Sequence, residues 1–305
     1  MEHSASGLAR QITLPQAVAL YVGAVLGSGV LLVPGYAAEA AGPASIAVWF
    51  LMALLALPMA LTLGALATRN PDAGGVSAYV RQAFGPRLAA VTGWLFLASV
   101  PIGTPVAALA AASYAKVALG LAAGPTFAIA FAIIGFALLN NLLGTNFLGR
   151  SQVVITGLIV AILAIAIGVA APHVAGAQFQ PFAPHGFVGM GQAAALMFWC
   201  FIGWEAVSHM SEEFANPERD TTRAILIAAF VVGLLYTLVG WVTVGTGAYG
   251  GAQSNGSLAL IISRYLGPAG GIVVAVVALF IALGVCNAYL GAAARLAYSL
   301  GREGV

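Results

Sequence analysis

The sequence predicts an all-α polytopic membrane protein, a transmembrane helical bundle in which each long helix crosses the bilayer. Composition carries the first part of this prediction, because the 305 residues are 61% hydrophobic and only 7% charged. About a quarter of the residues in a soluble domain are charged. The charge-free stretches are also long enough to cross a membrane, since a spanning helix needs about 20 apolar residues.

The individual helices follow from the turn signals that interrupt the apolar sequence. Residues 11–38 contain no charge, so we expect a retained first helix rather than a cleaved signal peptide. Later breaks contain glycine, proline or asparagine, as at Gly42-Pro43, Asn216-Pro217 and Gly267-Pro268. About eight spanning helices result. We expect them at residues 14–36, 43–68, 88–115, 125–145, 151–171, 188–210, 223–248 and 269–299.

The basic residues predict which end of the bundle faces the cytoplasm. If the N-terminus is cytoplasmic, the opposite side holds only Lys116 and Arg264. The cytoplasmic segments then hold Arg10, Arg69, Arg81, Arg87, Arg150, Arg219, Arg223, Arg295 and Arg302. Cytoplasmic loops carry the excess of lysine and arginine in membrane proteins. The sequence therefore predicts a cytoplasmic N-terminus.

The first candidate functional feature is an interruption in the first helix. Gly27, Ser28 and Gly29 are poor helix formers, and Pro34 removes a further backbone hydrogen bond. An opening here would free N–H groups that favour an anion, and carbonyls that accept hydrogen bonds from an ammonium group. The alternative is close helix packing through Gly23 and Gly27, which are four residues apart.

The second feature is Glu205, which follows the helix-breaking Gly203 by two residues in the sixth predicted helix. An acid within a span costs about 2.5–3.5 kcal/mol on insertion scales, which favours a functional role such as carrying a proton. The alternative is a structural acid that only accepts backbone hydrogen bonds. His209 lies one turn later, where we expect a solvated histidine near the membrane surface. Two interrupted helices, one early and one late, are typical of a transporter's binding site.

The other polar residues favour structural roles. We interpret most of the charged run from Glu212 to Arg223 as a solvated loop. Asn140, Asn141, Asn287 and Tyr289 lie in apolar segments, where such residues usually link helices.

Missing motifs narrow the function further. The sequence has no metal-ligand spacing of histidine and cysteine, no nucleophile elbow and no glycine-rich phosphate loop. We therefore expect no enzyme, no metal site and no cofactor, and the lack of a basic patch argues against nucleic acid. Cys200 and Cys286 lie in apolar segments and are expected to be buried thiols.

Three motifs, in order along the chain, resemble those of the amino acid–polyamine–organocation (APC) permeases. They are Gly27-Ser-Gly-Val, then Pro71-Asp-Ala-Gly-Gly-Val-Ser-Ala-Tyr79, then Phe201-Ile-Gly-Trp-Glu205 followed by Glu213-Phe-Ala-Asn-Pro-Glu-Arg219. The resemblance runs from about residue 12 to the end. Residues 83–96 and 197–201 look most like the bacterial exporters of methionine and branched-chain amino acids.

This resemblance implies the broken-helix fold of five-plus-five inverted repeats, with substrate bound in the middle of the membrane. We expect a single transmembrane domain over residues 1–305, with a first repeat at about 12–171 and a partial second repeat at about 188–305. Family members usually have about twelve helices, so a chain with about eight is expected to be C-terminally truncated.

The resemblance also implies the residues of the binding site. Backbone and hydroxyl groups at Ser28 and Gly29 would bind the carboxylate of an amino acid, and backbone carbonyls would accept hydrogen bonds from its ammonium group. Trp199 would also act as an aromatic gate. The full set of expected substrate-binding residues is Val25, Ser28, Gly29, Trp199, Ile202 and Gly203.

Together these features predict a secondary active transporter of the inner (plasma) membrane. It would move small neutral amino acids, with methionine, leucine, isoleucine and valine as candidates. Some family members use a lysine in helix five for proton coupling, but the only lysine here is Lys116. Glu205 is therefore the candidate that couples a proton to efflux by alternating access, and simple exchange is the alternative. A non-transporting amino-acid-binding subunit or sensor is the alternative, and a homodimer remains open beside a monomer.

Overall fold

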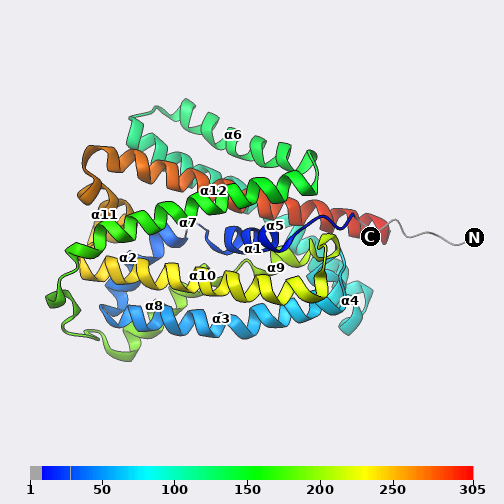
Figure 1. Cartoon of the computed structure of the whole chain (residues 1–305), viewed down its shortest axis with the longest axis horizontal. Coiled ribbons are helices and arrows are strands. Elements are labelled where there is room, and N and C mark those ends of the chain that lie inside the picture. The colour runs from blue at the N-terminus through cyan, green and yellow to red at the C-terminus, as the bar shows by residue number, and fades with distance from the viewer. Residues whose placement is uncertain (1–8, 28, 305) are drawn as a thin grey trace, which may run out of the picture.

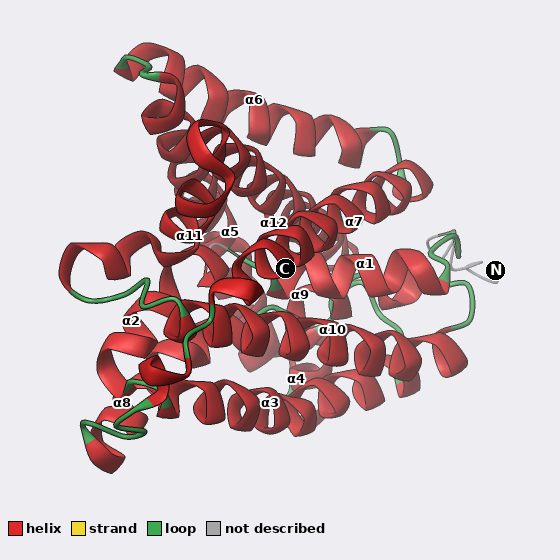
Figure 2. Cartoon of the chain, turned by 60° about the vertical axis from the view of Figure 1, so that its left-hand side comes forward, coloured by secondary structure: helices red, strands yellow, loops and turns green. Residues whose placement is uncertain are grey.

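A computed structural model of the chain describes residues 9–27 and 29–304. The described residues form helices joined by short loops (Figures 1 and 2), with an isolated bridge between Ile12 and Phe214 and no strand. The predicted all-α polytopic architecture is confirmed.

Within the described residues, seven helical elements are long and apolar enough to cross a membrane. The bent pair of α1 (Leu14–Val25) and α2 (Gly29–Ala41), whose halves differ in direction by 49°, brings the number to eight. Each predicted span overlaps one of these elements. The others are α3 (Ala44–Arg69), α5 (Pro86–Leu119), α6 (Ala123–Leu142), α7 (Thr145–Ala170), α8 (Gly186–Phe198) with α9 (Trp204–Ser208), α10 (Pro217–Gly245) and α12 (Gly270–Arg302).

Shorter helices fill the connections between the spans. The sequence analysis did not predict α4 (Val76–Phe84) or α11 (Ser257–Leu266), because each is too short to stand out as an apolar span. The 3₁₀ helices are η1 (Ala171–His173), η2 (Gly176–Phe179), η3 (Trp199–Phe201), η4 (Ser211–Glu213), η5 (Gly251–Gly256) and η6 (Gly267–Ala269).

The bundle has a central layer and a lipid-facing periphery. α10 packs along α3 and α12 along α5, while α1 lies among α7, α9, α10 and α12 (Figure 1). In α10 and α12, 56% of the most apolar window is buried, compared with 28% in α3, α5 and α6. The elements that meet at the centre are therefore α1, α9, α10 and α12, which come from both halves of the sequence.

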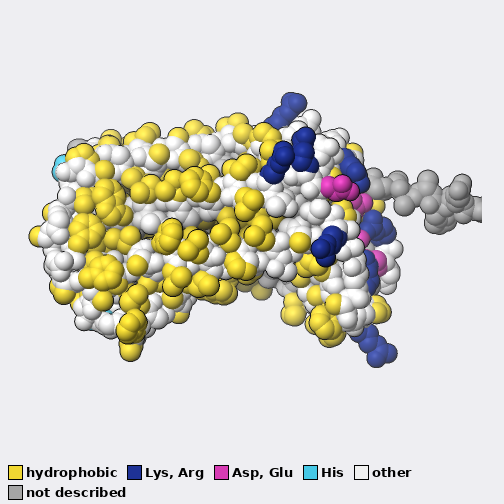
Figure 3. Space-filling model, turned by 60° about the horizontal axis from the view of Figure 1, so that its bottom comes forward, with side chains coloured by type: hydrophobic (Ala, Val, Ile, Leu, Met, Phe, Trp, Pro, Cys, Tyr) yellow, Lys and Arg dark blue, Asp and Glu magenta, His cyan; other side chains and the backbone are white. Residues whose placement is uncertain are grey.

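The surface divides into an apolar side and a charged end. Large apolar side chains lie exposed along the bundle, such as Phe131 at 72% and Phe230 at 70%, as a hydrocarbon environment requires. Most charged side chains gather at one end (Figure 3), which we call the charged end. It includes the loop before α4, η4, the start of α10 and the end of α12, and ion pairs such as Arg302–Asp72 lie there.

Candidate functional site

The first helix is broken where the sequence predicts it. α1 ends at Val25 and α2 begins at Gly29, and the backbone at Leu26 and Gly27 leaves the regular helical pattern. Leu26 adopts φ −72° and ψ 67°, and the N–H of Gly27 donates to the carbonyl of Val25 over 2.8 Å. Ser28, a predicted carboxylate ligand, lies outside the described residues.

The second break lies between α8 and α9. The chain passes from α8 through η3 to an extended Ile202, and α9 begins after Gly203. Gly203 has φ +130°, and a Cβ there would lie 2.7 Å from the carbonyl oxygen of Ala24. Both the positive φ and this close approach require glycine. The two breaks therefore face each other across a backbone-to-backbone contact.

A cavity of about 440 Å³ adjoins the two breaks. This volume lies within the range of small-molecule binding sites. The cavity is partly open, since Ile102 on α5 and Trp199 on η3 are 70% and 69% exposed. Its described lining comes from α1, α2, α5, η3, α10 and α12 and comprises Ala24, Val25, Gly27, Gly29, Ser99, Val100, Ile102, Gly103, Thr104, Val106, Ala107, Trp199, Cys200, Ile202, Tyr236, Val285 and Tyr289.

The cavity lies in the middle of the bundle. Ser99 is 13 residues beyond Pro86, the first residue of α5, which places it about 20 Å along the helix from the charged end. The described lining is mainly apolar and carries no charged side chain. Its polar groups are the backbone groups at the breaks and the side-chain groups of Ser99, Thr104, Trp199, Cys200, Tyr236 and Tyr289.

Four of the six predicted substrate-binding residues line this cavity. They are Val25, Gly29, Trp199 and Ile202. Gly203 is not part of the cavity lining, but it lies against the backbone of Ala24, which is. The binding roles of these residues remain predictions.

Glu205 is held beside the cavity rather than in its lining. One carboxylate oxygen accepts a hydrogen bond from the N–H of Gly203 over 3.0 Å, and the other accepts one from the Tyr289 hydroxyl over 3.0 Å. The first contact is the one expected of a structural acid, which accepts backbone hydrogen bonds. The second connects the carboxylate to a side chain that lines the cavity.

Tyr236 is a site residue that sequence reasoning missed. Its side chain is buried on α10, and its hydroxyl donates to the carbonyl of Val25 over 3.1 Å. The ring stacks on Trp49 at a centroid distance of 5.0 Å and contacts Phe201 at 5.4 Å. A tyrosine within an apolar span was the only signal, and nothing in the sequence indicates that it faces residue 25.

Residues 12–305 match the amino acid permease family along almost the whole chain. The chain belongs to this family, within the APC superfamily. The expected resemblance is thereby confirmed, and the protein is a multi-pass amino acid transporter of the cell membrane.

Curated relatives cover most of this permease. The uncharacterized amino acid permease YecA of Bacillus subtilis is 38% identical over 297 residues, which is 97% of this chain and 70% of the relative. The L-methionine/branched-chain amino acid exporter YjeH of Escherichia coli is 34% identical over 295 residues, or 96% of this chain and 71% of the relative. The branched-chain amino acid permease BcaP of Bacillus subtilis is 28% identical over 244 residues, 74% of this chain and 52% of the relative.

The expectation of a solvated His209 is wrong for the permease. His209 lies one residue beyond the span that ends at Ser208 and is 1% exposed. Its ring packs on Phe96 at 4.5 Å, and its Nδ1 lies 3.4 Å from the carbonyl oxygen of Ala73. Burial lowers the pKa of His209 to about 4. The loop before α4 folds over this histidine, which helix periodicity alone does not reveal.

The predicted helix-linking role of the asparagines is confirmed. The Asn287 amide donates to Gln152 Oε1 over 2.7 Å, and the Asn140 amide donates to Asn287 Oδ1 over 3.4 Å. Gln152 in turn donates to the carbonyl of Gly284 over 3.3 Å. These buried contacts join α6, α7 and α12.

Proposed function

We propose that the permease moves small neutral amino acids by alternating access through the cavity between its two broken helices. The observation that carries this proposal is a cavity of about 440 Å³ with an apolar lining and no charged side chain among its described residues. A charged substrate side chain would lose its hydration there without an ionic partner. A zwitterion with an apolar side chain needs only the backbone groups at the breaks.

The backbone at the breaks suits the two charged groups of a zwitterion. The N-terminal turn of α2 begins at Gly29, and helix N-termini favour anions such as a carboxylate. We assign the carboxylate to Ser28 and Gly29, and the ammonium group to the carbonyls of Val25, Trp199 and Ile202. A carbonyl oxygen has two lone pairs. Those of Val25 accept from the Tyr236 hydroxyl and from the N–H of Gly27, so the ammonium group would replace the Gly27 hydrogen bond.

The apolar wall of the cavity suits an aliphatic or thioether side chain. Val100, Ile102, Val106 and Val285 contribute to it from α5 and α12. Methionine, leucine, isoleucine and valine are the proposed substrates. The name of the Escherichia coli relative, an exporter of L-methionine and branched-chain amino acids, supports this choice and the direction of efflux.

We assign proton coupling to Glu205. Its carboxylate accepts hydrogen bonds from Gly203, at the second break, and from Tyr289, which lines the cavity. Protonation would weaken both contacts, because a carboxylic acid is a poorer acceptor than a carboxylate. The protonation state of Glu205 would thereby affect both the geometry of the second break and the position of Tyr289 in the cavity wall.

Two features support the proposed division into two repeats and the proposed orientation in the membrane. One broken helix begins the repeat at about 12–171 and another begins the repeat at about 188–305, which suits a single transporter domain of two related parts. The charged end carries most of the arginines, which favours a cytoplasmic position for it and for the N-terminus.

Reconstitution into proteoliposomes tests the proposal. We expect exchange of radiolabelled methionine and leucine, inhibition by isoleucine and valine, and no exchange of lysine or glutamate. Binding of these amino acids without any exchange would identify a receptor instead of a transporter, and an absence of both would overturn the proposed function.

The variant Glu205→Gln tests the coupling. We expect substrate binding to persist while the dependence of flux on an imposed pH gradient disappears, because the single amide oxygen of glutamine can accept the Gly203 hydrogen bond and the amide cannot carry the proton. Glu218→Gln is the matched control, since Glu218 lies exposed near the start of α10. A Glu205→Gln protein whose flux still follows the pH gradient would rule out Glu205 as the coupling residue.

A further inference from the structure

Three buried hydroxyl groups lie together between the end of α9 and the charged end. They belong to Tyr79 on α4, Ser208 on α9 and Ser211 on η4, and we call them the hydroxyl cluster. The Tyr79 hydroxyl lies beside the other two. Tyr79 is 7% exposed, Ser208 is 0% exposed and Ser211 is 1% exposed. The fold therefore shields all three groups from bulk solvent.

The hydroxyl cluster is not satisfied by protein groups alone. Among the described residues, none of its three oxygens has a hydrogen-bond partner of good geometry, and neither does Nε2 of the adjacent His209. Buried polar groups almost always pair with protein or with ordered water. A buried water makes about three hydrogen bonds to such groups. The cluster therefore offers the polar partners that ordered water needs.

His209 adds an acceptor next to the cluster but stores no proton near neutral pH. Its Nδ1 faces the carbonyl oxygen of Ala73 at 3.4 Å, so Nδ1 carries the hydrogen and Nε2 is left as an acceptor. Burial holds the pKa of His209 at about 4. Gly75 makes this packing possible, because it has φ +50° and a Cβ there would lie 2.5 Å from Nδ1 of His209.

One turn of α9 separates the hydroxyl cluster from Glu205. Ser208 follows Glu205 by three residues, which places the two side chains on one face of the helix with Cβ atoms about 5–6 Å apart. An ordered water can bridge such a gap. The carboxylate accepts from Gly203 at one oxygen and from Tyr289 at the other, and each oxygen retains a second lone pair. Glu205 can therefore face the cluster and the cavity wall at once.

Phe96 on α5 separates the hydroxyl cluster from the cavity. Its ring packs on His209 at a centroid distance of 4.5 Å and on Tyr289 at 6.2 Å. A phenylalanine ring has no group that donates or accepts a proton. The connection from the cluster to the cavity wall therefore runs through Glu205 and not past Phe96.

The other titratable groups around Glu205 are phenols and an imidazole. α1 contributes Tyr21, which packs against α9, and α12 contributes Tyr289. α9 continues into His209, and α3 carries only Arg69, which is exposed at its end. Among these described elements, Glu205 is the carboxylate that a proton from the cluster can reach.

Asp72 connects the outer side of the hydroxyl cluster to solvent. It lies in the loop before α4, its side chain is 23% exposed, and its charge acts on Tyr79. Arg81 and Arg302 pair with it at 3.6 and 3.3 Å. Exposed ion pairs of this kind are weak and screened by salt. The carboxylate of Asp72 therefore remains able to exchange protons with water.

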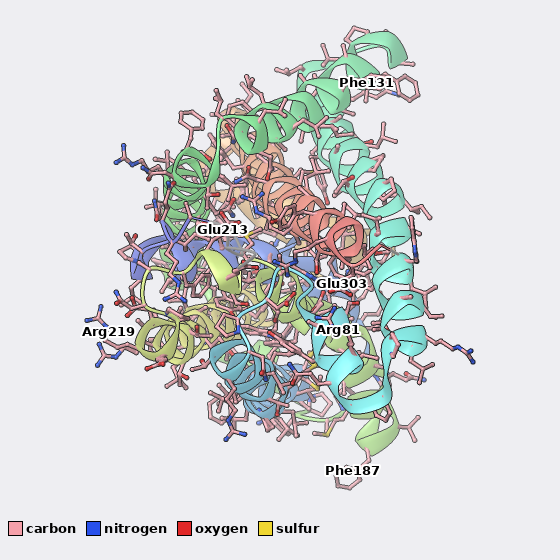
Figure 4. The ribbon with its side chains drawn as sticks, turned by 90° about the vertical axis from the view of Figure 1, so that its right-hand side faces the viewer. Arg81, Phe131, Phe187, Glu213, Arg219 and Glu303 are labelled. Atoms are coloured by element: carbon pink, nitrogen blue, oxygen red, sulfur yellow. The ribbon has the colours of Figure 1, made fainter. Side chains whose placement is uncertain are left out.

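Glu213 is engaged elsewhere, which corrects an expectation from the sequence. It belongs to the charged run that we interpreted mostly as a solvated loop, yet it is 2% exposed, as is Asp220. Seen from the charged end, Glu213 lies near the middle of the bundle, whereas Arg219 lies at its edge (Figure 4). Arg295 Nε donates to the Glu213 carboxylate over 2.6 Å. This carboxylate is therefore occupied, unlike the partly exposed acid in the loop before α4.

We propose that the hydroxyl cluster, completed by ordered water, conducts protons between the charged end and Glu205. This inference rests on the proposed proton coupling at Glu205. At each step an oxygen accepts a proton on a lone pair and releases its own hydrogen to the next acceptor, so no charge stays in the cluster. Tyr79, Ser208 and Ser211 touch no substrate in this mechanism and act only on the protonation of Glu205.

Two rates in proteoliposomes separate proton movement from substrate movement. One is exchange of methionine at equal pH on both sides, which requires no net proton transfer, and the other is net methionine flux driven by a pH gradient. We expect Tyr79→Phe and Ser208→Ala each to slow the gradient-driven flux about tenfold, because a positioned proton-transfer group contributes about a hundredfold and water replaces part of it. Exchange at equal pH should stay unchanged.

Matched variants distinguish proton conduction from general damage. Ser77→Ala removes an α4 hydroxyl that donates to the carbonyl of Ala89 outside the cluster, so the ratio of the two rates should stay unchanged. Tyr298→Phe is the control for Tyr79→Phe, because Tyr298 is 40% exposed on α12. Ser208→Thr keeps a hydroxyl group and should keep the gradient-driven rate. Tyr79→Phe keeps the ring, so it decides the question if the serine variants fail to fold.

The outcomes distinguish this inference from the proposed function. Gradient-driven flux of folded Tyr79→Phe equal to that of the unmodified protein overturns the proton route and leaves the transport proposal intact. Equal slowing of both rates would indicate general damage and would also overturn the route. If the unmodified protein exchanges methionine but does not respond to the pH gradient, the proton coupling fails and the route with it. Absence of any exchange overturns the transport proposal itself and the route that rests on it.

Discussion

At the scale of single residues, one hydroxyl group joins the middle of α10 to the break in α1. The Tyr236 hydroxyl donates to the carbonyl of Val25, while Trp49 and Phe201 fix its ring. The bond holds the direction of a carbonyl that no regular helical bond orients. Pre-organisation of this kind raises affinity because the site pays less ordering entropy when the ligand binds.

We expect Tyr236→Phe to weaken binding of methionine by about fivefold, the equivalent of about 1 kcal/mol for one hydrogen bond. The ring and its stacking remain, so the thermal unfolding temperature should change little. Isothermal titration in detergent measures both the affinity and the stoichiometry. Unchanged affinity would mean that the Val25 carbonyl needs no support from Tyr236, and Tyr236→Leu would then report only on the stacking.

At the scale of elements, a buried amide network holds α6, α7 and α12 together. Asn287 occupies its centre, because it donates to Gln152 and accepts from Asn140. Few waters can replace a lost partner in such a position. Each buried polar group left unpaired destabilises the fold by about 1–3 kcal/mol.

Asn287→Ala should therefore destabilise the permease by about 1–3 kcal/mol or more, since two partners are left unpaired. Thermal unfolding in detergent, followed by circular dichroism, measures the effect. Gln192→Ala is the control, because Gln192 is exposed on α8 and makes no such contact. Equal unfolding temperatures for the two variants would contradict a structural role for the network.

The burial of His209 between α9 and the loop before α4 predicts that the stability of the fold depends on pH. Burial holds the pKa of His209 at about 4, below the ordinary value of 6.5. Between these values the unfolded chain binds a proton that the folded chain does not. Stability from this group is therefore fully present above about pH 6.5 and is lost as pH falls toward 4, by about 1.4 kcal/mol per pH unit.

Unfolding temperatures measured between pH 7 and pH 4 check this expectation. The unmodified protein should lose more stability over this window than His209→Gln, whose side chain does not titrate. The comparison between the two proteins is needed because carboxylates also titrate toward pH 4. Parallel curves for the two proteins would show that protonation of His209 does not oppose folding.

At the scale of the whole molecule, charge is distributed along the axis of the bundle. Most of the arginines gather at the charged end, and Lys116 lies toward the other end of α5. Positively charged loops remain in the cytoplasm. The distribution of arginines therefore predicts that the charged end faces the cytoplasm.

We expect Arg150→Cys, at the charged end, to react with an impermeant thiol reagent from the cytoplasmic face only, and Lys116→Cys from the opposite face only. Both positions are exposed, and the native Cys200 and Cys286 are buried. Labelling of intact cells and of inverted vesicles gives the two rates. The reverse pattern would place the charged end outside.

The sequence by itself determined the class of the protein, its spanning helices and the positions of both breaks. These properties depend on composition and on local signals, such as the length of apolar runs and the glycines at residues 27, 29 and 203. It also predicted four residues that line the cavity, because the broken helices that carry them have recognisable motifs. The family resemblance extended these signals to Val25, Trp199 and Ile202.

Only the tertiary structure decided which distant side chains meet these breaks. Tyr236 faces Val25 across 211 positions in the chain, and Arg295 faces Glu213 across 82. Nothing local distinguishes Glu213, which the sequence analysis assigned to a solvated loop, from its exposed neighbour Glu218, although Glu213 is buried against Arg295. The physical reason is that helix packing sets burial and partners between segments, whereas the sequence pattern records only what each segment requires by itself.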